Sequence, residues 1–270
     1  MNGIVININP VALRLGAFDM RWYAIAILLA VVAAVFISIR EAVRKGLKQE
    51  HIYSLLPWVM GAGIVGARLF HVIDRWEDYR GNPALIFAFQ QGGLAIWGAV
   101  IGGFLAAIIY ARINRIKTWQ LLDVLVPGLL VAQIIGRVGC IINGDAYGAA
   151  ANLPWSFIYV NSNASIPPYL AGVPTQPYPL YEMLWNGLSL FLLWKLRPRL
   201  KSDGMLFATY LGIYSVGRFI LTFVRQEKVW FWGLQEAQVF SILIVLSALV
   251  VLFWLRSKGS KVPSGELLPT

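Results

Sequence analysis

Long apolar stretches separated by short polar ones run through most of this chain. A helix needs about 20 residues to cross the hydrocarbon core of a bilayer. Seven stretches reach or approach that length: 22–39, 52–73, 87–110, 121–142, 180–196, 204–224 and 237–255. The fifth is short and contains Glu182 and Asn186. The pattern predicts an all-α, polytopic membrane protein with seven transmembrane helices.

Basic residues in the polar connections indicate how these helices are oriented. Fourteen of the 23 Lys and Arg residues lie in connections 40–51, 111–119 and 195–203 and in the C-terminal tail, and six lie in the alternate connections. Cytoplasmic loops carry the excess of Lys and Arg, so we expect the N-terminus outside and the C-terminus in the cytoplasm. Residues 1–20 lack the charged start and cleavage site of a signal peptide, so the first span is expected to be retained. The expected organisation is one transmembrane catalytic domain, 1–255, followed by a polar cytoplasmic tail, 256–270.

Composition excludes several classes of protein. The chain is 58% hydrophobic and 13% charged, unlike a soluble domain. Its net charge of +10 does not indicate nucleic-acid binding, because the basic residues lie in short loops rather than on one polar face. One cysteine and two histidines form neither a disulfide framework nor a zinc pattern. No acidic cluster suited to Mg²⁺, P-loop or serine-nucleophile motif is present, so we expect no metal and no cofactor.

Three arginines interrupt the apolar runs: Arg68, Arg137 and Arg218. An arginine at the centre of a membrane helix costs roughly 2.5–3.5 kcal/mol on insertion scales, and such residues usually face a wet cavity or an anionic partner. In the predicted topology all three fall in the outer half of the membrane. The outer connection 146–179 contains no Lys, Arg, Asp or Glu. A connection of this length is expected to be functional or to contact a partner.

Arg137 opens the string Gly136-Arg137-Val138-Gly139-Cys140-Ile141-Ile142-Asn143-Gly144-Asp145-Ala146-Tyr147-Gly148. We expect the helix to break at Asn143-Gly144, where freed backbone groups need a cavity or protein partners. The planar guanidinium suits a phosphate. One interpretation is a lipid headgroup phosphate held by Arg137, with Asn143 and Asp145 orienting it or the acceptor. The alternative is a structural Arg137–Asp145 pair at a kink.

The sixth run carries a second cationic face. Tyr214, Arg218, Thr222 and Arg225 are spaced four, four and three residues apart, so they share one side of a helix. Arg225 is interpreted either as part of this face or as a side chain that reaches the headgroups. Arg68 lies among small residues typical of close helix packing. Its alternatives are a substrate role or a structural pair with Asp74 or a carbonyl. The glycines between 92 and 103 are interpreted first as packing surfaces.

The string around Arg137 resembles the signature of the prolipoprotein diacylglyceryl transferases, a bacterial enzyme family that lipidates a lipobox cysteine. The resemblance covers most of the chain. Further matching segments are, in order, Arg21-Trp22-Tyr23, Gly66-Ala67-Arg68, Gly92-Gly93-Leu94-Ala95-Ile96, Asp123, Tyr181-Glu182, Tyr214, Gly217-Arg218-Phe219 and Arg225. The family's seven-span, N-out architecture agrees with the topology expected from the loop charges.

The resemblance implies transfer of diacylglyceryl from phosphatidylglycerol to a cysteine thiol at the outer leaflet of the bacterial cytoplasmic (inner) membrane. The expected partners are phosphatidylglycerol, a prolipoprotein signal peptide with its lipobox cysteine, and the membrane. By motif match Arg137 holds the donor phosphate, and Arg218 helps bind it or stabilises the leaving group. The candidate catalytic residues are Arg137, Arg218, Asp145, Asn143 and Tyr23. The candidate substrate-binding residues are Arg137, Tyr214, Arg225, Gly93 and Gly148.

Four positions differ from the family pattern. Cys140 stands where the family commonly has Asn, Asp145 where it has Glu, Trp97 where a histidine is sometimes proposed as the base, and Thr222 where it has an acid. Arginines beside a thiol lower its pKa and stabilise a departing phosphate. We therefore expect thiolate attack on the glyceryl carbon, with Asp145 or water taking the proton. Two alternatives are an inactive relative that binds anionic lipid or signal peptide, and an anion or lipid transporter.

Overall fold

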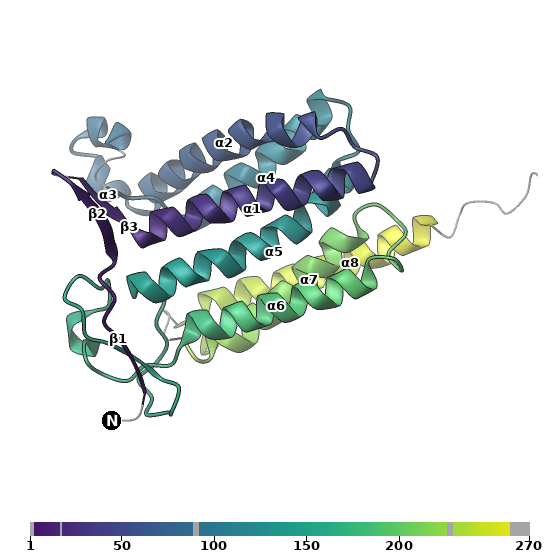
Figure 1. Cartoon of the computed structure of the whole chain (residues 1–270). Coiled ribbons are helices and arrows are strands. Elements are labelled where there is room, and N and C mark those ends of the chain that lie inside the picture. The colour runs from purple at the N-terminus through teal and green to yellow at the C-terminus, as the bar shows by residue number, and fades with distance from the viewer. Residues whose placement is uncertain (1–2, 17, 89–91, 226–228, 260–270) are drawn as a thin grey trace, which may run out of the picture. The chain divides into compact units, whose positions relative to one another are not determined.

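The computed structural model describes residues 3–16, 18–88, 92–225 and 229–259, and these residues are mostly helical (Figure 1). The long helices are α1 (Trp22–Arg44), α2 (Glu50–Asp74), α4 (Ile96–Ile113), α5 (Thr118–Asn143), α6 (Tyr178–Leu196), α7 (Met205–Thr222) and α8 (Glu236–Gly259). Short helical segments are α3 (Trp76–Tyr79), η1 (Pro83–Phe87) and η3 (Pro168–Leu170).

The long helices have the character of membrane spans. Within the described residues six are long and apolar enough to cross a bilayer: α1, α2, α4, α5, α7 and α8. Large apolar side chains on them are exposed, including Ile73 at 76% and Phe253 at 77%. Exposed apolar faces of this kind are stable against the lipid of a bilayer and not against water. The chain is therefore a polytopic membrane protein. Helix α6 is 19 residues long and is not among the six, because Glu182 and Asn186 make it more polar.

Two sequence expectations need correction. The third run does not begin a long helix at residue 87, because Pro83–Phe87 is a 3₁₀ segment and α4 starts at Ile96. The non-helical backbone there serves the buried Arg68, which donates to the carbonyl oxygens of Ile86 at 2.8 Å and Gly93 at 3.0 Å. Further carbonyls bound by Arg68 are those of Leu85, Ala88 and Gly92. The carbonyl alternative for Arg68 is thus confirmed. Residues 89–91 lie outside the described chain.

The second correction concerns the expectation of an all-α fold, since the described residues include six short strands. Strand β1 (Ile4–Ile6) pairs in parallel with β4 (Phe157–Tyr159). Strands β2 (Val11–Leu15) and β3 (Phe18–Arg21) form an antiparallel hairpin, as do β5 (Val229–Phe231) and β6 (Leu234–Gln235). Each has five residues or fewer and lies in a segment outside the seven apolar runs, so it gives no long alternating pattern in the sequence.

The connection between α5 and α6 is folded around a small core of its own. Phe157, Tyr159, Ile166 and Leu170 are buried together there. Burial raises the pKa of the Tyr159 phenol above its ordinary value, and the nearby charge of Asp145 acts in the same direction, so the phenol is neutral at physiological pH. The uncharged segment predicted to be functional is therefore an ordered element.

The chain divides into two compact units, of which one is residues 37–125. In this unit α2 packs closely against α4 through glycines (Figure 1). A Cβ added at Gly66 would lie 2.4 Å from the carbonyl oxygen of Gly98, and one added at Gly102 would lie 2.3 Å from that of Ala62. The interpretation of these glycines as packing surfaces is confirmed, because no larger residue fits this contact.

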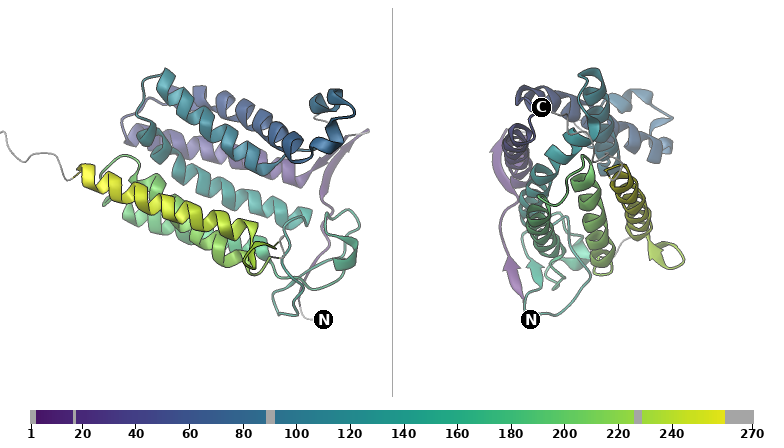
Figure 2. Two further views of the ribbon diagram at one scale, coloured as in Figure 1. Left: turned by 180° about the vertical axis from the view of Figure 1, so that it is seen from behind. Right: turned by 90° about the vertical axis from the view of Figure 1, so that its right-hand side faces the viewer.

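The other unit contains residues 1–36 and 126–270. Here α7 packs against both α6 and α8, and the three helices run side by side in both figures (Figures 1 and 2). A Cβ at Gly217 would lie 1.9 Å from Nε1 of Trp185, whose indole N–H donates to the carbonyl oxygen of Ile213 at 3.0 Å. This close approach brings the polar face of α6 against the polar face of α7.

Candidate active site

A buried carboxylate on α6 joins two of the three intramembrane arginines. Glu182 is only 5% exposed. Its Oε2 forms an ion pair with the guanidinium of Arg137 from α5, and its Oε1 lies 3.1 Å from Nη1 of Arg218 from α7. The two arginines therefore meet at one point between three helices. The carboxylate paired with Arg137 is Glu182, so the alternative of an Arg137–Asp145 structural pair is wrong.

Tyr178 extends this cluster by one helical turn of α6. Its hydroxyl donates to Oε1 of Glu182 at 2.8 Å and accepts a hydrogen bond from Arg218. The guanidinium groups of Arg218 and Arg225 lie 5.8 and 5.1 Å from the centre of its ring. Arg225 lies beyond the end of α7 at Thr222, so it does not share a helix face with Arg218 as its spacing predicted. Its guanidinium group nevertheless approaches the same ring as that of Arg218.

Tyr214 lies one turn before Arg218 on α7. It is within electrostatic range of Glu182, Arg218 and Arg137. Its ring centre lies 5.9 Å from that of Tyr210, whose hydroxyl accepts a hydrogen bond from Gln133 at 2.9 Å. Aromatic and amide groups therefore support the cluster along α5 and α7.

Two arginines of the cluster share one carboxylate. Arg137 and Arg218 both contact Glu182, so its single negative charge faces two positive charges. Holding charges away from bulk water costs several kcal/mol per ion after relaxation. An anionic ligand offsets this cost, and a phosphate fits the forked donors of two arginines. Anion binding is thus the chemistry that the arrangement favours.

The end of α5 brings three more sequence candidates to the same unit, namely Tyr23, Asn143 and Asp145. Nη1 of Arg137 lies 3.5 Å from the thiol sulfur of Cys140. Tyr23, in the first turn of α1, packs on Gly139 and is within electrostatic range of Arg137 and Asp145. The helix ends at Asn143, as predicted, and Gly144 follows with a φ of +76°.

The two glycine candidates have close packing partners. Gly148 donates its N–H to the carbonyl oxygen of Gln176 at 3.0 Å, and a Cβ there would lie 3.0 Å from the carbonyl oxygen of Val224. Gly93 belongs to the unit 37–125, where a Cβ would lie 2.6 Å from Nη1 of Arg68 and 2.8 Å from the His71 ring. Both positions require glycine for packing, and their substrate roles stay predictions.

Glu182 and Tyr178 are the residues that sequence reasoning missed as site members. In the sequence, Tyr181-Glu182 is a segment that matches the family, and Glu182 is a polar interruption of the fifth run. The available signal was the carboxylate itself, since an acid within a membrane-length helix pairs with a cation or marks a functional site. Three intramembrane arginines were the evident partners.

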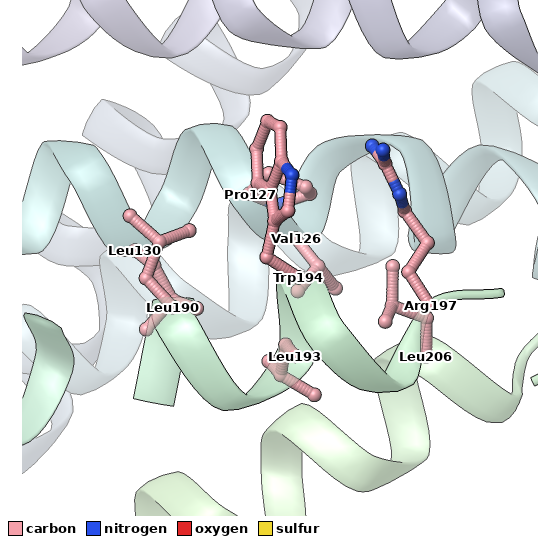
Figure 3. A pocket seen from close by; sticks show the side chains of 8 residues that line it. All are labelled: Val126, Pro127, Leu130, Leu190, Leu193, Trp194, Arg197 and Leu206. Carbon is pink, nitrogen blue, oxygen red and sulfur yellow. The ribbon is translucent and has the colours of Figure 1, made fainter. Parts of the chain in front are cut away.

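An apolar pocket lies elsewhere on the same helices (Figure 3). Its lining consists of Val126, Pro127, Leu130, Leu190, Leu193, Trp194, Arg197 and Leu206. Trp194 lies twelve residues after Glu182, which corresponds to roughly 18 Å along α6. The pocket is therefore separate from the charged cluster, and its lining offers no phosphate-binding pair of arginines.

Fold and cluster together define a polytopic membrane protein with two arginines that meet at one buried carboxylate. Comparison with known sequences gives the particular family. The profile of the prolipoprotein diacylglyceryl transferases matches residues 10–254, and the chain belongs to this family.

Three bacterial relatives illustrate the similarity, each named phosphatidylglycerol–prolipoprotein diacylglyceryl transferase. The Enterococcus faecalis protein is 38% identical over 259 residues, covering 92% of this chain and 91% of the relative. The Listeria welshimeri protein is 34% identical, with 96% and 94% covered. The Streptococcus agalactiae protein is 36% identical over 251 residues, with 92% and 96% covered. The similarity therefore extends over nearly the whole length of each protein.

Proposed function

We propose that this chain transfers the diacylglyceryl group of phosphatidylglycerol to the lipobox cysteine of prolipoproteins, the first step of lipoprotein maturation. The observation that carries the proposal is the meeting of Arg137 and Arg218 at Glu182 inside a membrane protein of this family. Two guanidinium groups held together in a low-dielectric region form a receptor for one phosphate. The names of the relatives agree with this chemistry.

The proposal includes the membrane arrangement. Seven helices cross the bacterial inner membrane, with α6 as the additional span, the N-terminus outside and the C-terminus in the cytoplasm. Residues 1–255 form the catalytic domain and 256–270 the cytoplasmic tail. The alternation of Lys and Arg between successive connections supports this orientation. The charged cluster then opens toward the leaflet that faces the incoming prolipoprotein.

The reaction is a substitution at the glyceryl carbon that bears the phosphate. The cysteine sulfur of the prolipoprotein forms a bond to this carbon, and the carbon–oxygen bond to phosphate breaks with its electron pair passing to the phosphate oxygen. The products are the thioether and glycerol phosphate, and the thiol proton goes to Asp145 or water. The leaving phosphate gains a negative charge, so Arg137 and Arg218 stabilise the transition state more than the ground state.

The remaining candidates have supporting roles in this scheme. Arg225 and Tyr214 extend the phosphate site on the α7 side, and Glu182 with Tyr178 keeps the arginines together. Tyr23, Asn143 and Asp145 line the end of α5, where the glycerol headgroup and the thiol meet. Gly148, in the same unit as the cluster, allows the backbone to approach the substrate closely. Gly93, in the unit 37–125, stays a predicted substrate contact.

The test is transfer of labelled phosphatidylglycerol to a lipobox peptide by the purified protein. We expect transfer by the unaltered chain and a loss of about 10²-fold or more in Arg137→Ala, the scale of removing one donor from a charge-stabilising site. Arg14→Ala, which removes an exposed arginine paired with Asp19, is the matched control and retains activity. Binding of lipid or peptide without transfer contradicts the proposal and supports an inactive relative.

A further inference from the structure

Asn143, the last residue of α5, is held at both of its oxygen atoms. Its side-chain Oδ1 accepts a hydrogen bond from Nη1 of Arg21 at 2.9 Å. Its main-chain oxygen accepts a hydrogen bond from the N–H of Ser165 at 2.8 Å. The same Nη1 of Arg21 also donates to the hydroxyl of Ser165 at 2.9 Å. Asn143 is 7% exposed, so it is nearly enclosed by these contacts.

The contact with Arg21 decides which way the Asn143 amide faces. An asparagine amide has one acceptor end and one donor end, and the two differ little in shape. Arginine has only donors, so Asn143 must turn its oxygen toward Arg21. The NH₂ group then faces away from Arg21. Asn143 is therefore fixed as a hydrogen-bond donor toward the remainder of its surroundings.

A donor at this position suits the substrate chemistry. Asn143 follows Arg137 by six residues, which corresponds to roughly 9 Å along α5. A donor lipid whose phosphate lies at Arg137 extends its glycerol hydroxyl and ester oxygens several ångströms beyond the phosphorus, and a donor side chain that reaches toward them from the end of α5 matches them. An acceptor turned the same way would repel the phosphate and its leaving oxygen.

Backbone contacts hold Arg21 at the base of the hairpin β2–β3. Arg21 is the last residue of β3 and pairs with Val11 of β2. The N–H of the following residue, Trp22, donates to the carbonyl oxygen of Pro10 at 2.9 Å. Arg21 thus lies at the junction of a strand pair and the start of α1, two residues before Tyr23.

We propose that Arg21 is a positioning residue, which fixes the Asn143 amide with its donors toward the substrate. This inference rests on the proposed transferase function. A purely structural role would instead be to hold the N-terminal hairpin against the α5–α6 connection through Ser165.

The first experiment measures kcat and KM for phosphatidylglycerol in Arg21→Met, alone and combined with Asn143→Ala. Misplacing a catalytic group costs up to about 10²-fold. We expect Arg21→Met to lower kcat by about 10- to 30-fold with KM changed less than threefold. In the Asn143→Ala background Arg21→Met should lower kcat by less than about threefold, because the amide that Arg21 positions is already absent. An equal loss of kcat from Arg21→Met in the unaltered protein and in Asn143→Ala overturns the inference.

Two further variants separate positioning from structure. Ser165→Ala removes the structural contact of Arg21 but leaves its contact with Asn143, and we expect activity within about threefold of the unaltered protein. A loss as large as that of Arg21→Met contradicts the inference. Asn143→Asp keeps an oxygen for Arg21 but replaces the donor end with an acceptor, and we expect a loss as large as in Asn143→Ala.

The Asn143→Asp result decides the matter even if Arg21→Met fails to fold, since an aspartate retains a partner for Arg21. Full activity in Asn143→Asp overturns the inference. Failure of the proposed function is recognised separately, because the unaltered protein would then show no transfer at all.

Discussion

Glu182 lies between two arginines, whose charge it offsets in part and whose side chains it keeps together. Without it Arg137 and Arg218 repel each other, and the phosphate site loses its shape while gaining charge. Loss of the Glu182 carboxylate should therefore disturb the positions of Arg137 and Arg218 more than it weakens the binding of phosphatidylglycerol.

Glu182→Gln tests this at nearly unchanged volume. We expect kcat to fall by about 10²-fold, the scale of losing one preorganised electrostatic contact, whereas KM for phosphatidylglycerol does not rise. The control is Glu50→Gln at the exposed start of α2, which should leave both parameters within about twofold. An increase in KM with kcat unchanged would show that Glu182 serves binding alone.

The chemistry of the thiol gives a second prediction at the residue scale. An isolated cysteine thiol has a pKa of about 8.5, and neighbouring cations lower it. Since Trp97 stands where the family pattern has a histidine, we expect kcat/KM to rise with pH to an inflection about one unit below that value. Arg218→Gln removes one cation, so its residual activity should show the inflection shifted upward. An inflection near 6.5, the ordinary value of a histidine, with no further rise would contradict thiolate attack.

At the scale of elements, contacts between helices depend on glycines that differ in what surrounds them. Gly66 on α2 touches the α4 backbone, whereas a Cβ added at Gly61 on the same helix meets nothing within 4 Å. The two positions form a matched pair that tests whether close packing or helix propensity decides how a Gly→Ala substitution changes stability.

We expect Gly66→Ala to lower the free energy of unfolding by about 1–3 kcal/mol, the usual cost of overpacking. Gly61→Ala should be neutral or stabilising by up to about 1 kcal/mol, because alanine favours the helix. Thermal unfolding in one detergent measures both. Equal effects would mean that α2 and α4 separate easily and that their contact contributes little.

The elements also show what the sequence predicted and what it did not. The apolar runs and the Asn143-Gly144 break were visible because bilayer thickness and glycine conformation act locally. The apolar character of residues 87–95 predicts a helix there and gives no sign of the backbone carbonyl groups that Arg68 binds. The Glu182 partners were not predicted, since the rotation of α6 against α5 and α7 depends on packing such as that of Gly217 on Trp185. Local patterns contain no such information.

For the molecule as a whole, the prediction to be tested is that α6 crosses the membrane as an additional span. Helix α6 carries Tyr178, Glu182 and Asn186 on a buried face, so its low hydropathy reflects the site that it builds rather than exposure to water. A polar helix enclosed by apolar neighbours can cross a bilayer because its charges are paired inside the protein. The connections at its two ends should then lie on opposite sides.

Single cysteines test this in a Cys140→Ser background, with labelling of intact cells by a membrane-impermeant maleimide. Ser162→Cys and Lys201→Cys place exposed thiols before and after α6, and Lys48→Cys marks the connection between α1 and α2. We expect labelling at 162 in intact cells, and labelling at 201 and 48 only after permeabilisation, because the connections rich in Lys and Arg face the cytoplasm. Labelling of 162 and 201 from the same side would show that α6 does not cross, and the cluster at Glu182 would then need another explanation for its charge.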